Sequence, residues 1–341
     1  MGSVSADRGD LDEWRGMATD ALRGALLAWR GELRPLAEEL VEHLGSMLRR
    51  GDGSQIAALA LPRAVHIGLR GTDPPDWLMA AASATYLAWD LLDDDMDGDP
   101  VKFWCARPAA DRTIGAHLLL ATAVAQAPLH AGPAGSAGLT RLYLDMVSTV
   151  TEGQLRAEVP LHVGTTPEAV AAGNDARSGA MLAGLAELAA NVAGADGPTC
   201  RAAARFGREL ALARQLVNDL TELASPRTSD LRNRTATMPA AFALQRTPPA
   251  DRAALVRRLH AAATDADLRR RMVDRDLRPA LADTRMLARL HLAEAIRLAG
   301  SFARRARGRA AVRSLIDYTA SGFPVSGDGR SAPAGSAVAW K

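Results

Sequence analysis

The stretch DLLDDDMDGDP, residues 90–100, comes directly after the apolar run from Trp77 to Trp89. It holds six aspartates within ten positions. Residues three and four apart share one face of an α-helix, so part of this stretch would present an acidic stripe. The stripe would consist of Asp90, Asp93, Asp94 and Asp97. Gly98 and Pro100 would end the helix directly after it.

Carboxylates packed this closely repel one another, and the stretch contains no basic residue that could offset the repulsion. A divalent cation would offset it. Mg²⁺ prefers oxygen ligands and keeps water and phosphate oxygens in its coordination shell. The stretch therefore predicts part of a Mg²⁺–phosphate site. The alternative is a solvated acidic helix end, which is the usual role of a run of charges.

Helical periodicity extends through nearly all of the 341 residues, without a convincing alternating strand or hairpin turn. Ala, Leu and Arg dominate, and all three are good helix formers. Length alone would suggest two domains. We nevertheless predict one all-helical domain over residues 11–320, because the 48% of apolar residues can form one sizeable core. Residues 1–10 and 321–341 are polar or rich in Gly, Ser, Pro and Ala, and are predicted to be flexible tails.

The composition also excludes several classes of function. A formal charge of +2 gives no electrostatic case for nucleic-acid binding. Cys105 and Cys200 lie far apart in the sequence, without metal-ligand spacing, as suits a reduced cytoplasmic protein. No apolar run is as long as a membrane span, and the first residues lack a signal-peptide pattern.

A second group of oxygen ligands follows near the end of a helix that is predicted to open at Pro198. It consists of Asn218, Asp219 and Glu222, which are three and four apart and can face one way. Two such helix ends facing each other would make a two-sided Mg²⁺ cage, for which a diphosphate is the natural ligand. Taken alone, this group is better explained as an ordinary polar helix end, and it gains its weight from the pairing with the first aspartate group. Residues 128–138 and 225–234 are predicted as loops, the latter exposed or lid-like.

The order of these features resembles the trans-isoprenyl diphosphate synthases (polyprenyl synthetases) and, more widely, the class I isoprenoid synthases. DDDMD, residues 93–97, matches the family's Asp-Asp-x-x-Asp motif. QLVNDLTE, residues 215–222, is similar to its Gln-x-x-Asp-Asp-x-x-Asp motif, with Asn218 and Glu222 substituted. Residues 153–154, 177–180 and 229–239 resemble its Gly-Gln pair, its Lys-Thr-Gly-Ala segment and its Asp-Leu…Thr-Leu-Pro segment. The resemblance spans roughly residues 20–320.

The resemblance implies an all-α isoprenoid synthase barrel of about ten or more helices around a deep apolar cavity. It implies that Asp93, Asp94 and Asp97 bind Mg²⁺ from one wall of that cavity. Asp219 and Glu222, with Asn218, would bind it from the other wall, and three Mg²⁺ ions would be present when diphosphate is bound. The substrate would be an allylic prenyl diphosphate, made a better leaving group by these metals. A homodimer is also expected from the resemblance.

Further residues are assigned to the substrate by the same resemblance. Arg177 would add a fixed, bidentate positive charge at the departing diphosphate. Gln154 would line the cavity and present its dipole to the forming carbocation. Trp89, one turn deeper than Asp93, would limit the chain to C10–C20, unless it is an ordinary core residue. The other assigned substrate-binding residues are Gln215, Lys102 and Arg234.

The chain departs from the family where isopentenyl diphosphate should bind. The segment Gln55–Pro62 lacks the family's Lys and Arg, Lys102 is the one base in the Arg-Arg-Gly position, and Thr235 replaces a later Lys. Each lost charge-assisted hydrogen bond is worth about 1.5–3 kcal/mol. We therefore predict that the chain ionises an allylic diphosphate and that the cation cyclises or passes to a non-standard acceptor.

Two alternatives remain. One is ordinary chain elongation with isopentenyl diphosphate, in which Arg63, Arg70 or Arg107 would replace the missing bases. The other is a non-catalytic subunit of a heteromeric synthase, which would have no need to keep a repulsive aspartate cluster. Against cyclisation, Glu222 and Pro226 stand where the cyclases' Asn-Asp-x-x-Ser-x-x-x-Glu motif has Ser and Glu. The second motif is thus closer to the prenyltransferases.

Overall fold

The computed structural model describes residues 8–31, 33–50, 53–97, 107–156, 159–224 and 229–321. Over these residues the chain is all-α, as predicted, and no strand forms. The only β-type pairing there is an isolated antiparallel bridge between Pro160 and Thr235. None of the described helices is both long enough and apolar enough to cross a lipid bilayer.

The first helices are α1 (Arg8–Leu26), α2 (Leu33–Arg50), α3 (Gly53–Arg70), α4 (Asp76–Asp97), α5 (Ala109–His130) and α6 (Gly132–Arg156). The middle of the chain forms α7 (Pro167–Asn174), the π-helix η2 (Asp175–Gly179), α8 (Ala180–Val192) and α9 (Gly197–Ala224). The last part forms α10 (Ser229–Asn233), α11 (Met238–Arg246), the 3₁₀-helix η3 (Pro249–Asp251), α12 (Arg252–Ala262), α13 (Ala266–Arg271), the π-helix η4 (Met272–Asp276), α14 (Arg278–Phe302) and α15 (Ala306–Ser321).

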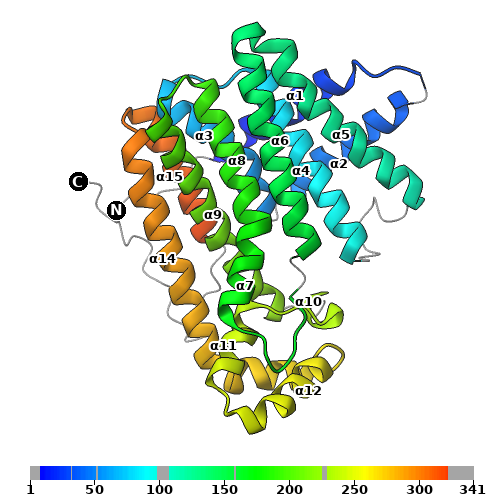
Figure 1. Cartoon of the computed structure of the whole chain (residues 1–341), viewed down its shortest axis with the longest axis vertical. Helices are drawn as coiled ribbons and strands as arrows, with labels where there is room; N and C mark the ends of the chain where they lie inside the picture. Colours follow the sequence, from blue (N-terminus) through cyan, green and yellow to red (C-terminus); the bar gives the residue numbers. More distant parts are fainter. Residues whose placement is uncertain are drawn as a thin grey trace.

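The long helices pack side by side, and the shorter helices α10 to α12 lie together at one end of the bundle (Figure 1). α4 packs on α1 and α5, α8 packs on α9, and α15 packs on α3. α14 runs along α9 and extends from the long helices to α11 (Figure 1). In this arrangement the C-terminal ends of α4, α6 and α9 point toward the end of the bundle where α10 to α12 lie (Figure 1).

Two hydrophobic clusters form the interior. The larger one includes residues of α1 to α6, α8 and α15, and the smaller one lies among α7, α11, α12 and the start of α14. α9 contributes to both, with Phe206 in the larger cluster and Leu220 in the smaller one. α14 does the same, with Phe302 and Leu281. Two continuous helices thus tie the two clusters together, which favours the predicted single domain.

The turn between α3 and α4 is fixed by Asp73. Its carboxylate forms an ion pair with Arg63 Nη2 at 2.9 Å and another with Arg307 Nη2 of α15 at 2.5 Å. Burial would raise the pKa of Asp73, but the hydrogen bond from Arg307 and the charge of Arg63 outweigh burial and hold it below its usual value. Asp73 therefore joins three helices at the N-terminal end of α4.

Three predicted boundaries were wrong. α1 begins at Arg8, so residues 8–10 belong to a helix and not to a tail. Residues 128–138 are not a loop, because α5 continues to His130 and α6 begins at Gly132. The φ of 70° at Gly132 allows that turn to be so short. Within residues 225–234, Ser229–Asn233 form α10, while residues 225–228 lie outside the described residues.

Candidate functional site

The C-terminal ends of α4 and α6 bring Asp93 and Gln154 together. Gln154 Nε2 donates a hydrogen bond to Asp93 Oδ1 at 3.2 Å, and both side chains are half-buried. The two residues are 61 positions apart in the sequence. The structure thus joins the first aspartate motif to the predicted Gly-Gln pair. The sequence did not predict this contact, in which the amide of Gln154 orients the carboxylate of Asp93.

Gly153 brings α6 against the π-helix η2, which carries Arg177. A Cβ atom at Gly153 would lie only 2.3 Å from the carbonyl oxygen of Ala176, so the close approach requires glycine. Asp175 begins η2 and forms an ion pair with Arg208 Nε of α9 at 3.2 Å. π-type turns within helices occur frequently at functional sites. The predicted Gly-Gln pair and Arg177 therefore lie on directly packed elements.

Asp219 lies near the end of α9 and is only 3% exposed. Its Oδ1 accepts a hydrogen bond from Gln215 Nε2 at 3.0 Å, and its Oδ2 accepts one from the main-chain N–H of Met238 at 2.8 Å. Burial raises the pKa of Asp219 to about 6, against the opposing effect of these two hydrogen bonds and the positive charge of Arg177. η2, which carries Arg177, packs against α9.

The second predicted ligand group does not face one way. Asn218 is exposed, Asp219 is buried and Glu222 is half-buried. Consecutive residues on a helix point in directions about 100° apart, so Asn218 and Asp219 diverge although Asp219 and Glu222 lie one turn apart. The charge of Glu222 contributes to the raised pKa of Asp219, as expected for two nearby carboxylates.

The remaining predicted site residues are placed as follows. Trp89 is 7% exposed, belongs to the larger hydrophobic cluster, and its Nε1 has no hydrogen-bond partner among the described residues. Arg234 is exposed and follows α10 with a φ of 58°. Lys102 lies outside the described residues, as do the side chains of Asp94 and Asp97. Their predicted roles stay predictions.

The donor set has the chemistry that a hard cation requires, since Asp93, Asn218 and Glu222 all offer side-chain oxygens. Among the described side chains, however, no group of three His, Cys, Asp or Glu residues is close enough to hold a metal ion. The side chains of Asp94 and Asp97, two of the predicted ligands, are not among the described side chains. The described residues therefore fit Mg²⁺ in ligand type and leave the complete ligand set as a prediction.

Sequence reasoning missed two contacts near the site. One is the hydrogen bond from the main-chain N–H of Met238 to Asp219. A partner for this N–H could have been anticipated, because the first N–H groups of a helix lack partners within that helix. The other is an ion pair between Asp95 and Arg112 of α5. This ion pair gives a partner to an aspartate that lies outside the predicted metal set.

Two of the three alternative bases for an acceptor site lie far from the aspartates. Arg63 is buried and paired with Asp73, which precedes the N-terminus of α4. Asp93 lies 17 residues into that helix, about 25 Å away at 1.5 Å per residue. Arg70 ends α3 and lies against Gly194, in the turn before α9. Neither arginine can reach a diphosphate held near Asp93.

Arg107 is the third alternative base, and it lies at the aspartate end of the fold. Its guanidinium pairs with Glu39 of α2, and Nη1 lies 3.5 Å from Asp111 Oδ2. The ion pair between Asp95 and Arg112 shows that the start of α5 adjoins the end of α4. Arg107 is thus the one of the three whose position suits an acceptor diphosphate.

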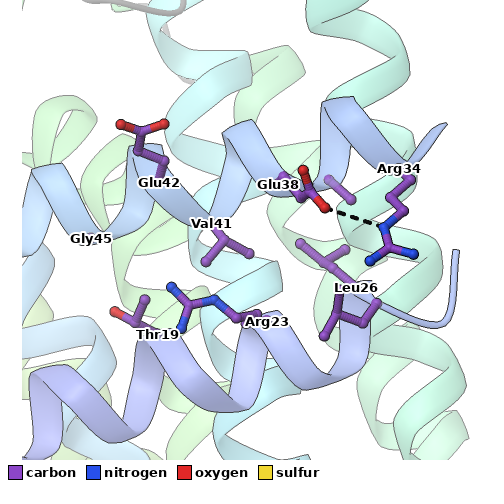
Figure 2. Close-up of a pocket in the computed structure, with 10 residues that line it drawn as sticks. Thr19, Arg23, Leu26, Arg34, Glu38, Val41, Glu42 and Gly45 are labelled. Atoms are coloured by element: carbon purple, nitrogen blue, oxygen red, sulfur yellow. Dashed lines mark hydrogen bonds and ion pairs between the residues drawn. The ribbon is translucent and has the colours of Figure 1, made fainter. Parts of the chain in front are cut away.

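A separate groove of about 510 Å³ lies between α1 and α2 (Figure 2). Leu26 and Val41 form part of its apolar lining, and Arg34 Nε forms an ion pair with Glu38 Oε1 at 3.2 Å beside it. Arg23 also lines it and pairs with Asp20 at 3.0 Å. None of the predicted site residues is among its lining residues, and the formal charges of the two arginines and two glutamates that line it cancel.

Comparison with known proteins reveals similarity in structure but not in sequence. No family model matches the chain, and no curated protein matches it either. A polyprenyl synthetase from Streptomyces coelicolor A3(2) superposes with a TM-score of 0.72 at 22% identity, covering 92% of this chain and 99% of that one. A geranylgeranyl pyrophosphate synthetase from Pyrococcus horikoshii gives a TM-score of 0.74 at 15% identity, covering 91% and 97%.

A third similar structure is a geranylgeranyl pyrophosphate synthase from Corynebacterium glutamicum in complex with calcium and isoprenyl diphosphate. Its TM-score is 0.68 at 19% identity, and the superposition covers 94% of this chain and 99% of that one. The chain therefore has the fold of the polyprenyl synthetases, and the resemblance seen in its motifs is confirmed at the level of the fold. All three structures match this chain over almost their whole length.

Proposed function

We propose that this chain is a Mg²⁺-dependent enzyme that ionises a short allylic prenyl diphosphate, of C10 to C20, and transfers the resulting prenyl cation. The observation that carries the proposal is the meeting of three elements. α4 and α6 meet through the hydrogen bond between Gln154 and Asp93, and α6 packs at Gly153 against η2, the element that carries Arg177. η2 also packs against α9, which carries Asp219. The polyprenyl synthetase fold supports this interpretation.

The chain's own residues would divide the work between binding and protection. Gln154 would hold the Asp93 carboxylate in one orientation, and Arg177 would donate to the oxygens of the departing diphosphate. The buried side chains around Trp89 would exclude water from the carbocation. Asp93, Asp94, Asp97, Asn218 and Glu222 would hold the Mg²⁺ ions, which when bound supply Lewis-acid stabilisation of the leaving diphosphate.

Chain elongation is the first candidate for the fate of the cation. The bond between the allylic carbon and the diphosphate oxygen breaks, and its electron pair leaves with diphosphate. The double bond of isopentenyl diphosphate then forms the new carbon–carbon bond, and a proton is lost. The similar structures carry the names of chain-elongating enzymes, and the second motif is prenyltransferase-like. These points favour elongation over cyclisation. The cationic residue that binds the second diphosphate would be Lys102 or Arg107, since Arg63 pairs with Asp73 beside the N-terminus of α4 and Arg70 lies against Gly194.

Cyclisation, or transfer to another acceptor, is the second candidate. The segment upstream of the first motif offers no base, and Arg107 is already paired with Glu39. A site with so few free positive charges would bind a second diphosphate weakly.

Incubation with geranyl, farnesyl and geranylgeranyl diphosphates and Mg²⁺, with and without isopentenyl diphosphate, tests the proposal. Products would be treated with phosphatase and identified by gas chromatography. Longer prenyl alcohols formed only with isopentenyl diphosphate would establish elongation. Cyclic hydrocarbons or alcohols formed without it would establish cyclisation. Unchanged substrate under every condition would contradict the proposed function.

A homodimer built through α5 and α6 is the assembly that we propose. From Thr113 to Thr140 these helices contain no Asp, Glu, Lys or Arg. Ile114 and Leu129 are 46% and 70% exposed, so this uncharged segment has large apolar side chains to bury, and Leu144 just beyond it is 50% exposed. Light scattering after size exclusion would give twice the mass of one chain, and a monomer would contradict this assembly.

A further inference from the structure

Asp219 is the most deeply buried of the predicted metal ligands whose side chains the structure describes. Both of its oxygens accept hydrogen bonds from within the protein. One of the donors is the N–H of Met238, the first residue of α11. The first N–H groups of a helix have no partner within it, and a carboxylate at that end also interacts favourably with the helix dipole. Asp219 thus joins α9 to the start of α11.

The segment that leads into α11 is held from its other side by residues 159–161. The N–H of Leu161 donates to the carbonyl of Arg234 at 2.7 Å, and the N–H of Ala236 donates to the carbonyl of Val159 at 2.9 Å. Arg234 has a φ of 58°, a conformation that non-glycine residues rarely adopt. Such a conformation persists only where the surroundings hold it. Residues 234–238 are therefore fixed at one end by main chain and at the other by Asp219.

We propose that Asp219 is a positioning residue and not a metal ligand. Its carboxylate fixes the start of α11 against α9 and thereby sets where Arg234 stands at the diphosphate site. Metal binding on this wall then falls to Asn218 and Glu222, whose side chains are more exposed. The part of the proposal that concerns Arg234 rests on the proposed function. The attachment of α11 to α9 does not depend on it.

Substitution by asparagine separates the two roles. The Asp219→Asn side chain would keep an oxygen that can accept from the Met238 N–H, and the amide of Gln215 can rotate to accept from the new NH₂ group. The positioning contact is therefore kept, whereas the negative charge that a metal ligand would supply is lost. Asp219→Ala removes both. Glu222→Gln is the matched control, because it removes one carboxylate charge from the same helix end.

The first measurement is Mn²⁺ binding, followed by electron paramagnetic resonance with inorganic diphosphate present. We expect Asp219→Asn to bind Mn²⁺ as the unaltered chain does. Glu222→Gln should bind it about tenfold more weakly, a difference of about 1.4 kcal/mol. An equal loss in both variants would overturn the proposal that Asp219 is not a ligand. Unchanged binding in Glu222→Gln would overturn the assignment of Glu222.

The second measurement is amide hydrogen exchange. In Asp219→Ala the amides of residues 234–241 should exchange faster than in the unaltered chain, while those of α14 keep their rates. Asp219→Asn should restore slow exchange. Equal rates in all three proteins would overturn the positioning role, and so would exchange that rises throughout the chain in both variants. Exchange needs no turnover, so it tests the attachment even if no allylic diphosphate reacts.

A kinetic measurement tests the consequence for Arg234. Where the chain turns over an allylic diphosphate, Asp219→Ala should raise KM more than it lowers kcat, because in the proposed function Arg234 would bind the diphosphate and not the reacting carbon. Asp219→Asn should return KM to its original value. A loss confined to kcat would contradict this link.

Discussion

Individual residues of the site are held by contacts that the motifs alone do not reveal. The sequence placed Asp93 and Gln154 in the same cavity, but the hydrogen bond between their side chains depends on how α4 and α6 end beside each other. Burial of Asp219 was equally hidden, because its partner is a main-chain group 19 residues away. Spacing within a helix predicts a shared face. It cannot predict which member of that face another element will cover.

Gln154→Leu should weaken the site without unfolding the chain. It removes the donor that orients Asp93, and a hydrogen bond to a charged group is worth about 1.5–3 kcal/mol. We expect kcat/KM for the allylic diphosphate to fall about 10- to 100-fold in steady-state assays. Gln126→Leu is the control, since Gln126 is buried in α5 and donates to the carbonyl of Thr122 in its own helix. Equal effects of the two substitutions would contradict the role of Gln154.

Trp89→Ala should lengthen the chains that the enzyme accepts or makes. The indole lies one turn before Asp93 inside the larger hydrophobic cluster, so its removal opens space below the diphosphate. Product chain length would be read by chromatography. Trp77→Ala is the control on the same helix, at the far end where Trp77 stacks on His130. Trp89→Ala should lower the free energy of unfolding by about 3–5 kcal/mol, and Trp77→Ala by less because Trp77 is half-buried. Unchanged products from Trp89→Ala would mean that Trp89 is an ordinary core residue.

At the scale of elements, close packing between helices positions the site. α6 meets η2 at Gly153, and the α3–α4 turn is fixed to α15 through Asp73. The helical elements themselves were predictable from periodicity and from Gly and Pro. The π-helix η2 was not, because nothing in the segment from Asp175 to Gly179 distinguishes it from an ordinary helical turn. The loop predicted to begin at Pro128 was also wrong, because a proline near the end of a helix does not have to end it.

Gly153→Ala should push α6 away from η2. Its Cβ would lie 2.3 Å from the Ala176 carbonyl oxygen, and a backbone atom cannot move aside cheaply. Overpacking of this kind costs about 1–3 kcal/mol, which urea unfolding would measure. Activity should fall as well, because Arg177 moves with η2. Gly138→Ala in the same helix meets open space and should stabilise the chain slightly. A stable, active Gly153→Ala variant would contradict the close packing.

The α3–α4 turn should lose stability in acid. The pKa of Asp73 lies below its value in an unfolded chain, so the unfolded state binds more protons as the pH falls past that value. The stabilisation from Asp73 is therefore complete at neutral pH and disappears as the pH falls below about 4. The free energies of unfolding of the unaltered chain and of Asp73→Asn should differ at pH 7, and the difference should shrink as the pH falls below about 4. A difference that stays constant or grows on acidification would contradict this account.

At the scale of the whole molecule, the sequence predicted the all-α fold and the order of the site motifs along the chain. Which arginines could serve a second diphosphate was not predictable, because that depends on which end of each helix faces the site. Arg63 and Arg70 are near the first motif in sequence, but both lie toward the C-terminal end of α3, which adjoins the N-terminus of α4 and not its aspartate end. Of the three arginines, only Arg107 lies at the aspartate end of the described fold, next to the start of α5.

The proposed function requires that the aspartate end of α4 promote ionisation of an allylic diphosphate. It is tested most directly by measuring diphosphate release from geranyl and farnesyl diphosphates, with and without Mg²⁺ and in the presence of isopentenyl diphosphate. We predict release that requires Mg²⁺ and that falls at least about a hundredfold in Asp93→Asn. The Asp145→Asn variant, changed at an exposed position on α6, should release diphosphate normally. Release that needs no Mg²⁺, or that survives in Asp93→Asn, would contradict the claim.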